Sequence, residues 1–156
     1  MNSTPQDSLT EIYAFRRIND HLATSGQPSA AQFPLIHGAG FEAVINLALA
    51  TSDNALPNEG GIVSGLGMTY VHIPVNFQTP GDGDFQTFCG IMKTLTGHQT
   101  FVHCAANMRV SAFVFLYRVL YDGIEPGVAK ADLNAIWEPD EVWADFISRQ
   151  LKLGKS

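Results

Sequence analysis

The residues best suited to chemistry lie in one stretch, in which four residues separate Cys104 from Arg109. An apolar run ends in His103 and Cys104, and small, turn-prone residues then lead into a long apolar segment. If a strand ends at the cysteine, the amides of the following loop and the N-terminus of the next helix would attract an anion. The same partial positive charge favours a thiolate, which makes Cys104 a candidate nucleophile.

Arg109 adds a planar fork of donors that suits two oxygens of a phosphate. Asparagine tolerates a positive φ, so Asn107 favours a tightly curved loop. The stretch therefore predicts a phosphate-binding loop with Cys104 and Arg109 as its catalytic residues. The residues expected to surround the anion run from the loop into the first helical turn: Ala105, Ala106, Asn107, Met108, Arg109 and Val110.

The elements that must position this loop alternate between strand-like and helix-like segments. Strands are predicted over 22–25, 43–49, 69–73 and 100–103, and helices over 28–37, 85–95, 109–121, 127–136 and 139–152. Residues 50–67 are rich in Gly, Asn, Asp and Ser and predict a long loop with at most a short helix. This alternation predicts a three-layer α/β/α fold around a mostly parallel sheet of four to five strands. Ligands of such sheets bind beyond the carboxyl ends of the strands, where Cys104 should lie.

Length and composition describe a compact globular protein. With 156 residues, 46% of them hydrophobic, we expect a flexible tail over 1–9 and a single domain over 10–156. A net charge of −6 with nine scattered basic residues argues against nucleic-acid or membrane partners. Two cysteines, a polar amino terminus and the lack of a membrane-length apolar run favour the cytoplasm. The histidines show no metal-ligand spacing, so no metal or cofactor is expected, and the oligomeric state stays open.

The stretch from His103 to Ser111 resembles the signature of cysteine-dependent phosphatases of the protein-tyrosine and dual-specificity type, which is His-Cys, five residues, Arg, then Ser or Thr. Segments 25–28, 40–47 and 72–75 are similar to a bacterial branch of small phosphatases. The resemblance implies a dual-specificity-phosphatase-like fold and hydrolysis of a phosphomonoester through a cysteinyl-phosphate. The substrate would be a phosphorylated small molecule or a phosphoprotein. His103 and Ser111 would support the loop. His103 would orient it by hydrogen bonding to the loop backbone.

The loop departs from this signature because it has four residues where the family has five. Either the loop is shorter, or the helix keeps its register, since Ser111 lies seven residues after Cys104. In the second case Arg109 comes one residue before the position of the signature's arginine, and Val110 occupies that position. The short spacing also resembles rhodanese-like sulfurtransferases, whose smaller cradle suits a persulfide sulfur. A displaced arginine would fit a catalytically weak anion-binding or regulatory domain. The upstream segments resemble phosphatases, so that function is the first hypothesis.

A phosphatase also needs an acid to protonate the leaving oxygen, since an alkoxide leaves poorly. The family that this chain resembles supplies an aspartate from a loop upstream of the cysteine, but that neighbourhood here holds Asn76. Asp82 and Asp84 are the remaining candidates, on a glycine-containing segment that could move. We predict Asp82 as the acid, against the alternative that both are solvated and that Asp84 caps a helix. Cys89, on the apolar face of a predicted helix, is expected in the core.

Overall fold

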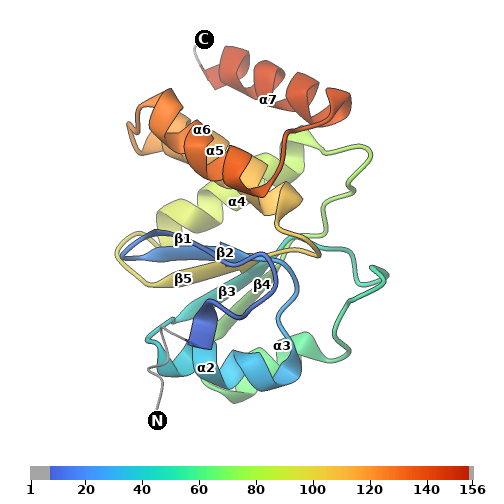
Figure 1. The fold of residues 1–156 in the computed structure, drawn as a ribbon, viewed down its shortest axis with the longest axis vertical. Coiled ribbons are helices and arrows are strands. Elements are labelled where there is room, and N and C mark those ends of the chain that lie inside the picture. The colour runs from blue at the N-terminus through green and yellow to red at the C-terminus, as the bar shows by residue number, and fades with distance from the viewer. Residues whose placement is uncertain (1–7, 155–156) are drawn as a thin grey trace.

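The computed structural model of the chain describes residues 8–154 and has a five-stranded sheet at its centre (Figure 1). The strand order is β1-β2-β5-β3-β4. Strands β2, β5, β3 and β4 run parallel, and β1 joins the edge as the antiparallel partner of β2. The strands are β1 (Arg16–Asn19), β2 (Leu22–Ser25), β3 (Ala43–Asn46), β4 (Thr69–His72) and β5 (Thr100–His103).

Helices cover both faces of the sheet, which confirms the predicted three-layer α/β/α class. Figure 1 shows α2 and α3 on one side of the sheet and α4 to α7 on the other. None of the helices within residues 8–154 is long and apolar enough to cross a membrane. The helices are η1 (Ala30–Gln32), α2 (Phe33–Gly38), α3 (Glu59–Gly65), α4 (Asp82–Thr94), α5 (Met108–Tyr121), α6 (Pro126–Ile136) and α7 (Glu141–Gly154).

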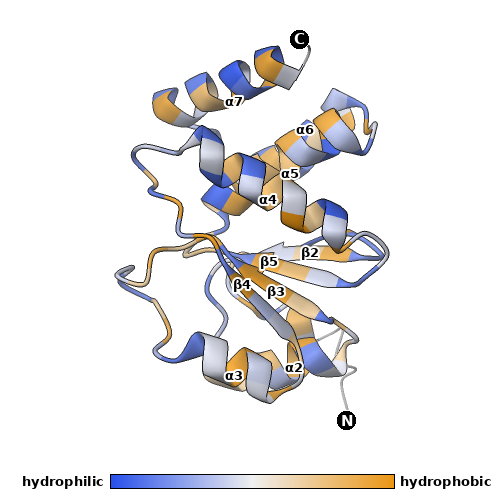
Figure 2. Cartoon of the chain, turned by 180° about the vertical axis from the view of Figure 1, so that it is seen from behind, coloured by the Kyte–Doolittle hydropathy of each residue, from blue (hydrophilic) through white to orange (hydrophobic). Residues whose placement is uncertain are grey.

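Two apolar clusters, one on each face, hold these layers together. The larger joins the sheet to α4, α5 and α7 through aromatic rings, and the centroids of Phe85 and Phe113 lie 5.2 Å apart. The smaller packs Phe33 and Phe41 beneath the sheet against Phe101. Full burial of each such ring contributes about 1.5–3 kcal/mol. Figure 2 shows the resulting hydrophobic bands along β3 and β5.

The structure differs from the predicted elements mainly near the amino terminus. β1 was not predicted, because Arg16–Asn19 holds only one apolar residue, Ile18, and shows no alternation. Residues 1–7 of the predicted tail lie outside the described residues. Leu9, the last residue assigned to that tail, is fully buried and belongs to the smaller cluster. Backbone pairing and tertiary packing therefore order a segment whose sequence reads as polar.

The order of the strands places the end of β5 at the centre of one edge of the sheet. β5 returns to lie between β2 and β3, with His103 opposite Ser25 on one side and Asn46 on the other. Cys104 follows directly, and α5 begins at Met108. A strand end flanked by two parallel neighbours opens the crevice in which α/β proteins bind ligands.

Candidate active site

The loop between β5 and α5 turns sharply at Asn107, whose φ is +65°. This left-handed conformation suits asparagine better than most other side chains. The side-chain amide of Asn107 donates to the carbonyl oxygen of Ala14 at 2.9 Å and to Thr24 Oγ1 at 3.1 Å. Asn107 thereby ties the loop to β2 and to the segment that precedes β1.

Neighbouring segments also hold the carbonyl side of the loop. The carbonyl oxygen of Ala105 accepts from the N–H of Gln27 at 3.2 Å and from Asn54 Nδ2 at 3.0 Å. A Cβ on Gly26 would lie 2.8 Å from this oxygen, so the close approach of the two backbones requires glycine. The first N–H groups of α5 have no partner within the helix, and a helix N-terminus of this kind can attract an anion.

Cys104 is fully buried, and the residues that follow it line an open hollow of about 660 Å³. The hollow lies at the carboxyl edge of the sheet, between the β5–α5 loop and the loops that follow β3 and β4. Among its described lining residues, Asp53 is the one carboxylate and Arg109 the one cation. The lining consists of Tyr13, Leu49, Thr51, Ser52, Asp53, Asn54, Asn76, Phe77, Gln78, Ala105, Ala106 and Arg109.

Arg109 presents its guanidinium to this hollow from the first turn of α5. Its Nη1 donates to the carbonyl oxygen of Val75 at 2.9 Å, and its Cζ lies 5.8 Å from the centroid of Phe77. Its Nε is buried and has no hydrogen-bond partner among the described residues. Val110 is fully buried in the apolar core. Arg109, not Val110, is therefore the residue of the first turn that faces the hollow.

His103 and Ser111 lie on either side of the loop. His103 Nδ1 lies 3.2 Å from the carbonyl oxygen of Cys104, which brings the imidazole to the loop backbone. Ser111 Oγ donates to the carbonyl oxygen of Met108 at 2.9 Å and accepts from Trp137 Nε1 at 3.1 Å. Ser111 thus joins the start of α5 to the end of α6.

Glu59, the first residue of α3, is a buried carboxylate beneath the loop that sequence reasoning missed. Its Oε2 lies 2.7 Å from His103 Nε2, and its Oε1 accepts from Gln27 Nε2 at 2.7 Å. Burial alone would raise the pKa of Glu59, but the hydrogen bond and charge of His103, together with hydrogen bonds from Gln27 and Tyr70, hold that pKa below its ordinary value of 4.5. The only sequence signal was a carboxylate, one of two in a stretch assigned to a loop.

The structure does not bring Asp82 to the hollow. Asp82 begins α4, and its Oδ1 accepts from Arg149 Nη2 at 2.8 Å and from Gln150 Nε2 at 2.6 Å. The hydrogen bond from Arg149 lowers the pKa of Asp82, which keeps its carboxylate ionised at neutral pH. Neither Asp82 nor Asp84 lines the hollow, whereas Asp53 does. The position of Asp82 gives no support to the acid role predicted for it.

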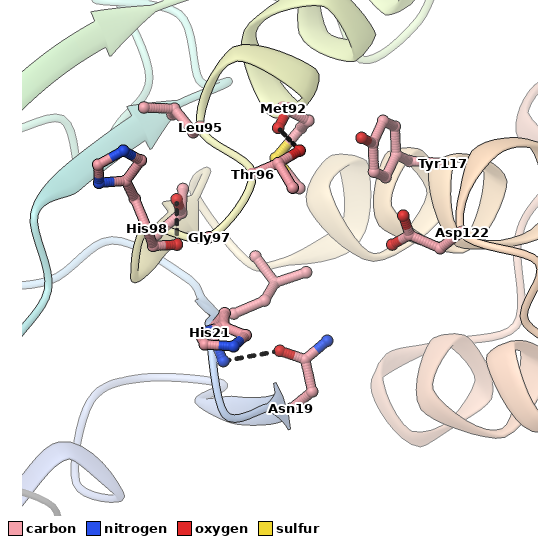
Figure 3. Close-up of a pocket in the computed structure, with 11 residues that line it drawn as sticks. Asn19, His21, Met92, Leu95, Thr96, Gly97, His98, Tyr117 and Asp122 are labelled. Atoms are coloured by element: carbon pink, nitrogen blue, oxygen red, sulfur yellow. Dashed lines mark hydrogen bonds between the residues drawn. The ribbon is translucent and has the colours of Figure 1, made fainter.

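A second hollow, of about 210 Å³, lies at the opposite edge of the sheet, where β2 and β5 begin (Figure 3). His21, His98, Tyr117 and Asp122 are among its lining residues. It is separated from Cys104 by the length of β5. Within residues 8–154, no three His, Cys, Asp or Glu side chains group as metal ligands would.

The sheet order and its helical layers define an α/β domain with a dual-specificity-phosphatase-like fold. No family model matches the chain. A solved structure from Shewanella putrefaciens CN-32, described as a candidate phosphatase (DUF442), is 32% identical, covers 94% of this chain and 97% of its own, and has a TM-score of 0.85. The chain belongs to this DUF442 family. The structure of Tk-PTP in its active form, 15% identical over 89% of this chain and 97% of its own with a TM-score of 0.76, shares the fold.

Curated relatives carry a different name. The β-lactamase hydrolase-like protein of Agrobacterium fabrum is 31% identical over 124 residues, which are 76% of this chain and 27% of that protein. A protein of the same name from Xylella fastidiosa is 29% identical over 109 residues, or 66% of this chain and 24% of that protein. The chain thus spans about a quarter of the length of these curated relatives.

The two cysteines should differ sharply in reactivity. Cys89 is buried on α4, and burial raises the pKa of its thiol to about 12 against a smaller opposing effect of Lys93. We expect iodoacetamide at pH 7 to modify Cys104 at least about tenfold faster than Cys89, because only Cys104 lies in a loop that leads into a helix N-terminus. Mass spectrometry of the alkylated peptides measures both rates.

Inorganic phosphate, sulfate or vanadate should slow the alkylation of Cys104 by occupying the loop. The Cys89→Ser variant serves as the control, since it removes the second thiol and leaves the loop intact. Equal modification of the two cysteines, or an alkylation rate of Cys104 that no anion changes, would contradict the assignment of the loop as an anion site.

Proposed function

We propose that this domain hydrolyses a phosphomonoester, with Cys104 as the nucleophile and Arg109 as the ligand of the transferred phosphoryl group. One observation carries the proposal. Arg109 reaches the hollow with a buried and unpaired Nε, and its other contacts are a carbonyl oxygen and a phenyl ring. A guanidinium without a carboxylate partner keeps its charge available, and an anion with two oxygens fits its fork.

In the first step, Cys104 Sγ attacks phosphorus as the thiolate, so that the S–P bond forms and the bond to the leaving oxygen breaks. The amides from Ala105 to Val110 and the guanidinium of Arg109 stabilise the charge on the equatorial oxygens. In the second step, water attacks phosphorus and the S–P bond breaks. Inorganic phosphate then leaves, and the thiolate is restored.

Proton transfer in this scheme is assigned to Asp53 instead of Asp82. Asp53 lies on the loop after β3 and shares the lining of the hollow with Arg109. In its protonated form it would give a proton to the leaving oxygen, and its carboxylate would take one from the attacking water. Asp82 Oδ1 accepts hydrogen bonds from Arg149 and Gln150, which hold this carboxylate outside the hollow.

The substrate proposed is a small molecule or a protein that carries a phosphate ester. The hollow is wide and its lining is mostly uncharged, with polar and apolar side chains mixed and with Tyr13 and Phe77 as aromatic members. Such a lining suits a phosphate on a polar or aromatic alcohol. We place the activity in the cytoplasm, which fits a loop that depends on a free thiol.

Sulfur transfer is the second candidate function, because the loop has four residues between Cys104 and Arg109. A loop of this length is smaller than the phosphatase signature requires, and it would suit a persulfide on Cys104. Thiosulfate would then give its outer sulfur to the Cys104 thiolate and leave as sulfite, and cyanide would remove that sulfur as thiocyanate.

Parallel assays of para-nitrophenyl phosphate hydrolysis and of thiosulfate-to-cyanide sulfur transfer test the two functions. We expect slow hydrolysis and no thiocyanate, with hydrolysis abolished by Cys104→Ser because serine is a far weaker nucleophile. Thiocyanate formation without hydrolysis would replace the phosphatase with a sulfurtransferase. Anion binding to Cys104 in the absence of both activities would leave a binding domain.

The variant Arg109→Lys tests the guanidinium fork while keeping the charge. We expect the loss of bidentate contact to cost about 2–4 kcal/mol in the transition state, or roughly 30- to 1000-fold in kcat/KM. Arg149→Lys is the matched control, because its guanidinium binds Asp82 at the surface, away from the hollow. Equal activities of Arg109→Lys and the unaltered protein would remove Arg109 from the transition state.

Two aspartate variants identify the acid. We expect Asp53→Asn to lower hydrolysis of phenyl phosphate by about a hundredfold and to affect para-nitrophenyl phosphate much less, because only a poor leaving group needs the proton. Asp82→Asn should leave both rates within about twofold, since that side chain lies outside the hollow. The reverse pattern would return the acid role to Asp82.

A further inference from the structure

The loop that joins β3 to α3 carries Asp53, and it runs out from the sheet before it returns to α3 (Figure 1). Residues 51–54 of this loop line the hollow of about 660 Å³ that Arg109 faces. A further hollow, of about 400 Å³, is lined by other residues of the same loop, Ala50 and 55–58. A loop flanked by two hollows has less packing than the elements that it joins, so hydrogen bonds have to fix its position.

Two polar side chains at strand ends hold the beginning of this loop. Asn46 ends β3 and His72 ends β4, and the two are partners in the register of these parallel strands. Asn46 Oδ1 accepts from the N–H of Ala48 at 2.8 Å, and His72 Nε2 donates to the carbonyl oxygen of Ala48 at 2.7 Å. An Nε2 proton is present in a neutral tautomer as well as in the imidazolium, so this bond requires no particular charge on His72. Both backbone polar groups of Ala48 are therefore bound by side chains.

The tip of the loop is a turn that is bound to the loop after β5. The N–H of Ala55 donates to the carbonyl oxygen of Ser52 at 3.0 Å. Asp53 and Asn54 are thus the two central residues of this turn. Asn54 Nδ2 donates to the carbonyl oxygen of Ala105 at 3.0 Å. The turn that carries the carboxylate is therefore held against the loop that would bind the phosphate.

The Asp53 carboxylate itself stays free for proton transfer. Among residues 8–154 it has no hydrogen-bond or ion-pair partner, whereas Asp82 is bound to Arg149. A proton donor acts only within hydrogen-bond reach of the leaving oxygen, and a displacement of about 1 Å can cost about a hundredfold in rate. The activity of Asp53 therefore depends on what holds its turn in place.

We propose that Asn46, His72 and Asn54 are positioning residues, which fix the turn with Asp53 beside the loop after β5. The inference rests on the proposed role of Asp53 as the acid. In this scheme the three side chains touch neither the sulfur nor the reacting phosphate, and they act through Asp53. The acid is then supplied by a loop that is already in place before the substrate binds, instead of by a flap that closes over it.

Hydrolysis of two esters by the His72→Leu variant tests whether His72 acts through Asp53. We expect kcat/KM for phenyl phosphate to fall about tenfold and kcat/KM for para-nitrophenyl phosphate to change less than about threefold, because only the poor leaving group needs the acid. His72→Gln keeps a donor and should restore part of the loss. Asn54→Ala, at an exposed position, should repeat the pattern of His72→Leu if that variant fails to fold.

A double variant separates positioning from a general structural role. In an Asp53→Asn background, His72→Leu should have no further effect on phenyl phosphate, since no acid is left to position. Equal losses with both esters, or a second tenfold loss in the Asp53→Asn background, would overturn the proposal.

Amide hydrogen exchange tests the hydrogen bonds of the loop without any substrate. We expect His72→Leu to speed exchange at Ala48 and Asn54→Ala to speed exchange at Ala55, each at least about tenfold, with the amides of β5 unchanged. Ser64→Ala is the matched control, because Ser64 Oγ donates to the carbonyl oxygen of Gly60 at 2.7 Å within α3, outside the loop.

The exchange rates and the hydrolysis rates can fail separately. Rapid exchange at Ala48 and Ala55 in the unaltered protein, or rates that neither variant changes, would overturn the proposal that these side chains hold the loop. Absence of hydrolysis by the unaltered protein would overturn the proposed function, and the exchange rates would still show whether the loop is fixed.

Discussion

A chain reversal completed between the end of β5 at His103 and the start of α5 at Met108 is the constraint on which the site depends. So short a connection requires a left-handed residue, supplied by Asn107, and a neighbour without a side chain, supplied by Gly26. The reversal brings a strand end and a helix N-terminus to the same place. Cys104 and Arg109 are consequently presented together by backbone geometry, before any side-chain contact is considered.

Arg109 differs from other buried or helical arginines of the protein because it has no carboxylate partner among residues 8–154. Arg149 binds Asp82, and Arg118 shares Asp132 with Arg16, so each of these guanidinium groups has a carboxylate partner. Arg109 contacts a carbonyl oxygen and the face of Phe77 instead. An arginine that is buried beside neutral groups keeps a net charge at a cost in desolvation, and an anion would relieve that cost. This difference, more than the presence of an arginine, marks the loop as a candidate active site.

The fold class and the loop were predictable because their signals are local. Apolar runs predicted β5 and α5 closely, and asparagine at position 107 indicated the left-handed turn that the structure has. β1 was missed because an edge strand with charged residues buries too little apolar surface to produce a pattern. Glu59 and Asp53 were missed for a different reason. Their neighbours come from remote segments, and no spacing in the sequence records a contact between α3 and β5.

The acid assignment shows how tertiary packing can change the meaning of a sequence pattern. The glycines around Asp82 suggested a mobile flap, but α7 holds both ends of that region. Trp143 Nε1 donates to the carbonyl oxygen of Phe77 at 2.7 Å, and Arg149 binds Asp82. The loop after β4 is therefore anchored by α7. Its Val75 carbonyl oxygen also accepts a hydrogen bond from Arg109. A carboxylate that reaches the hollow has to come from the other side of the crevice, where the loop after β3 carries Asp53.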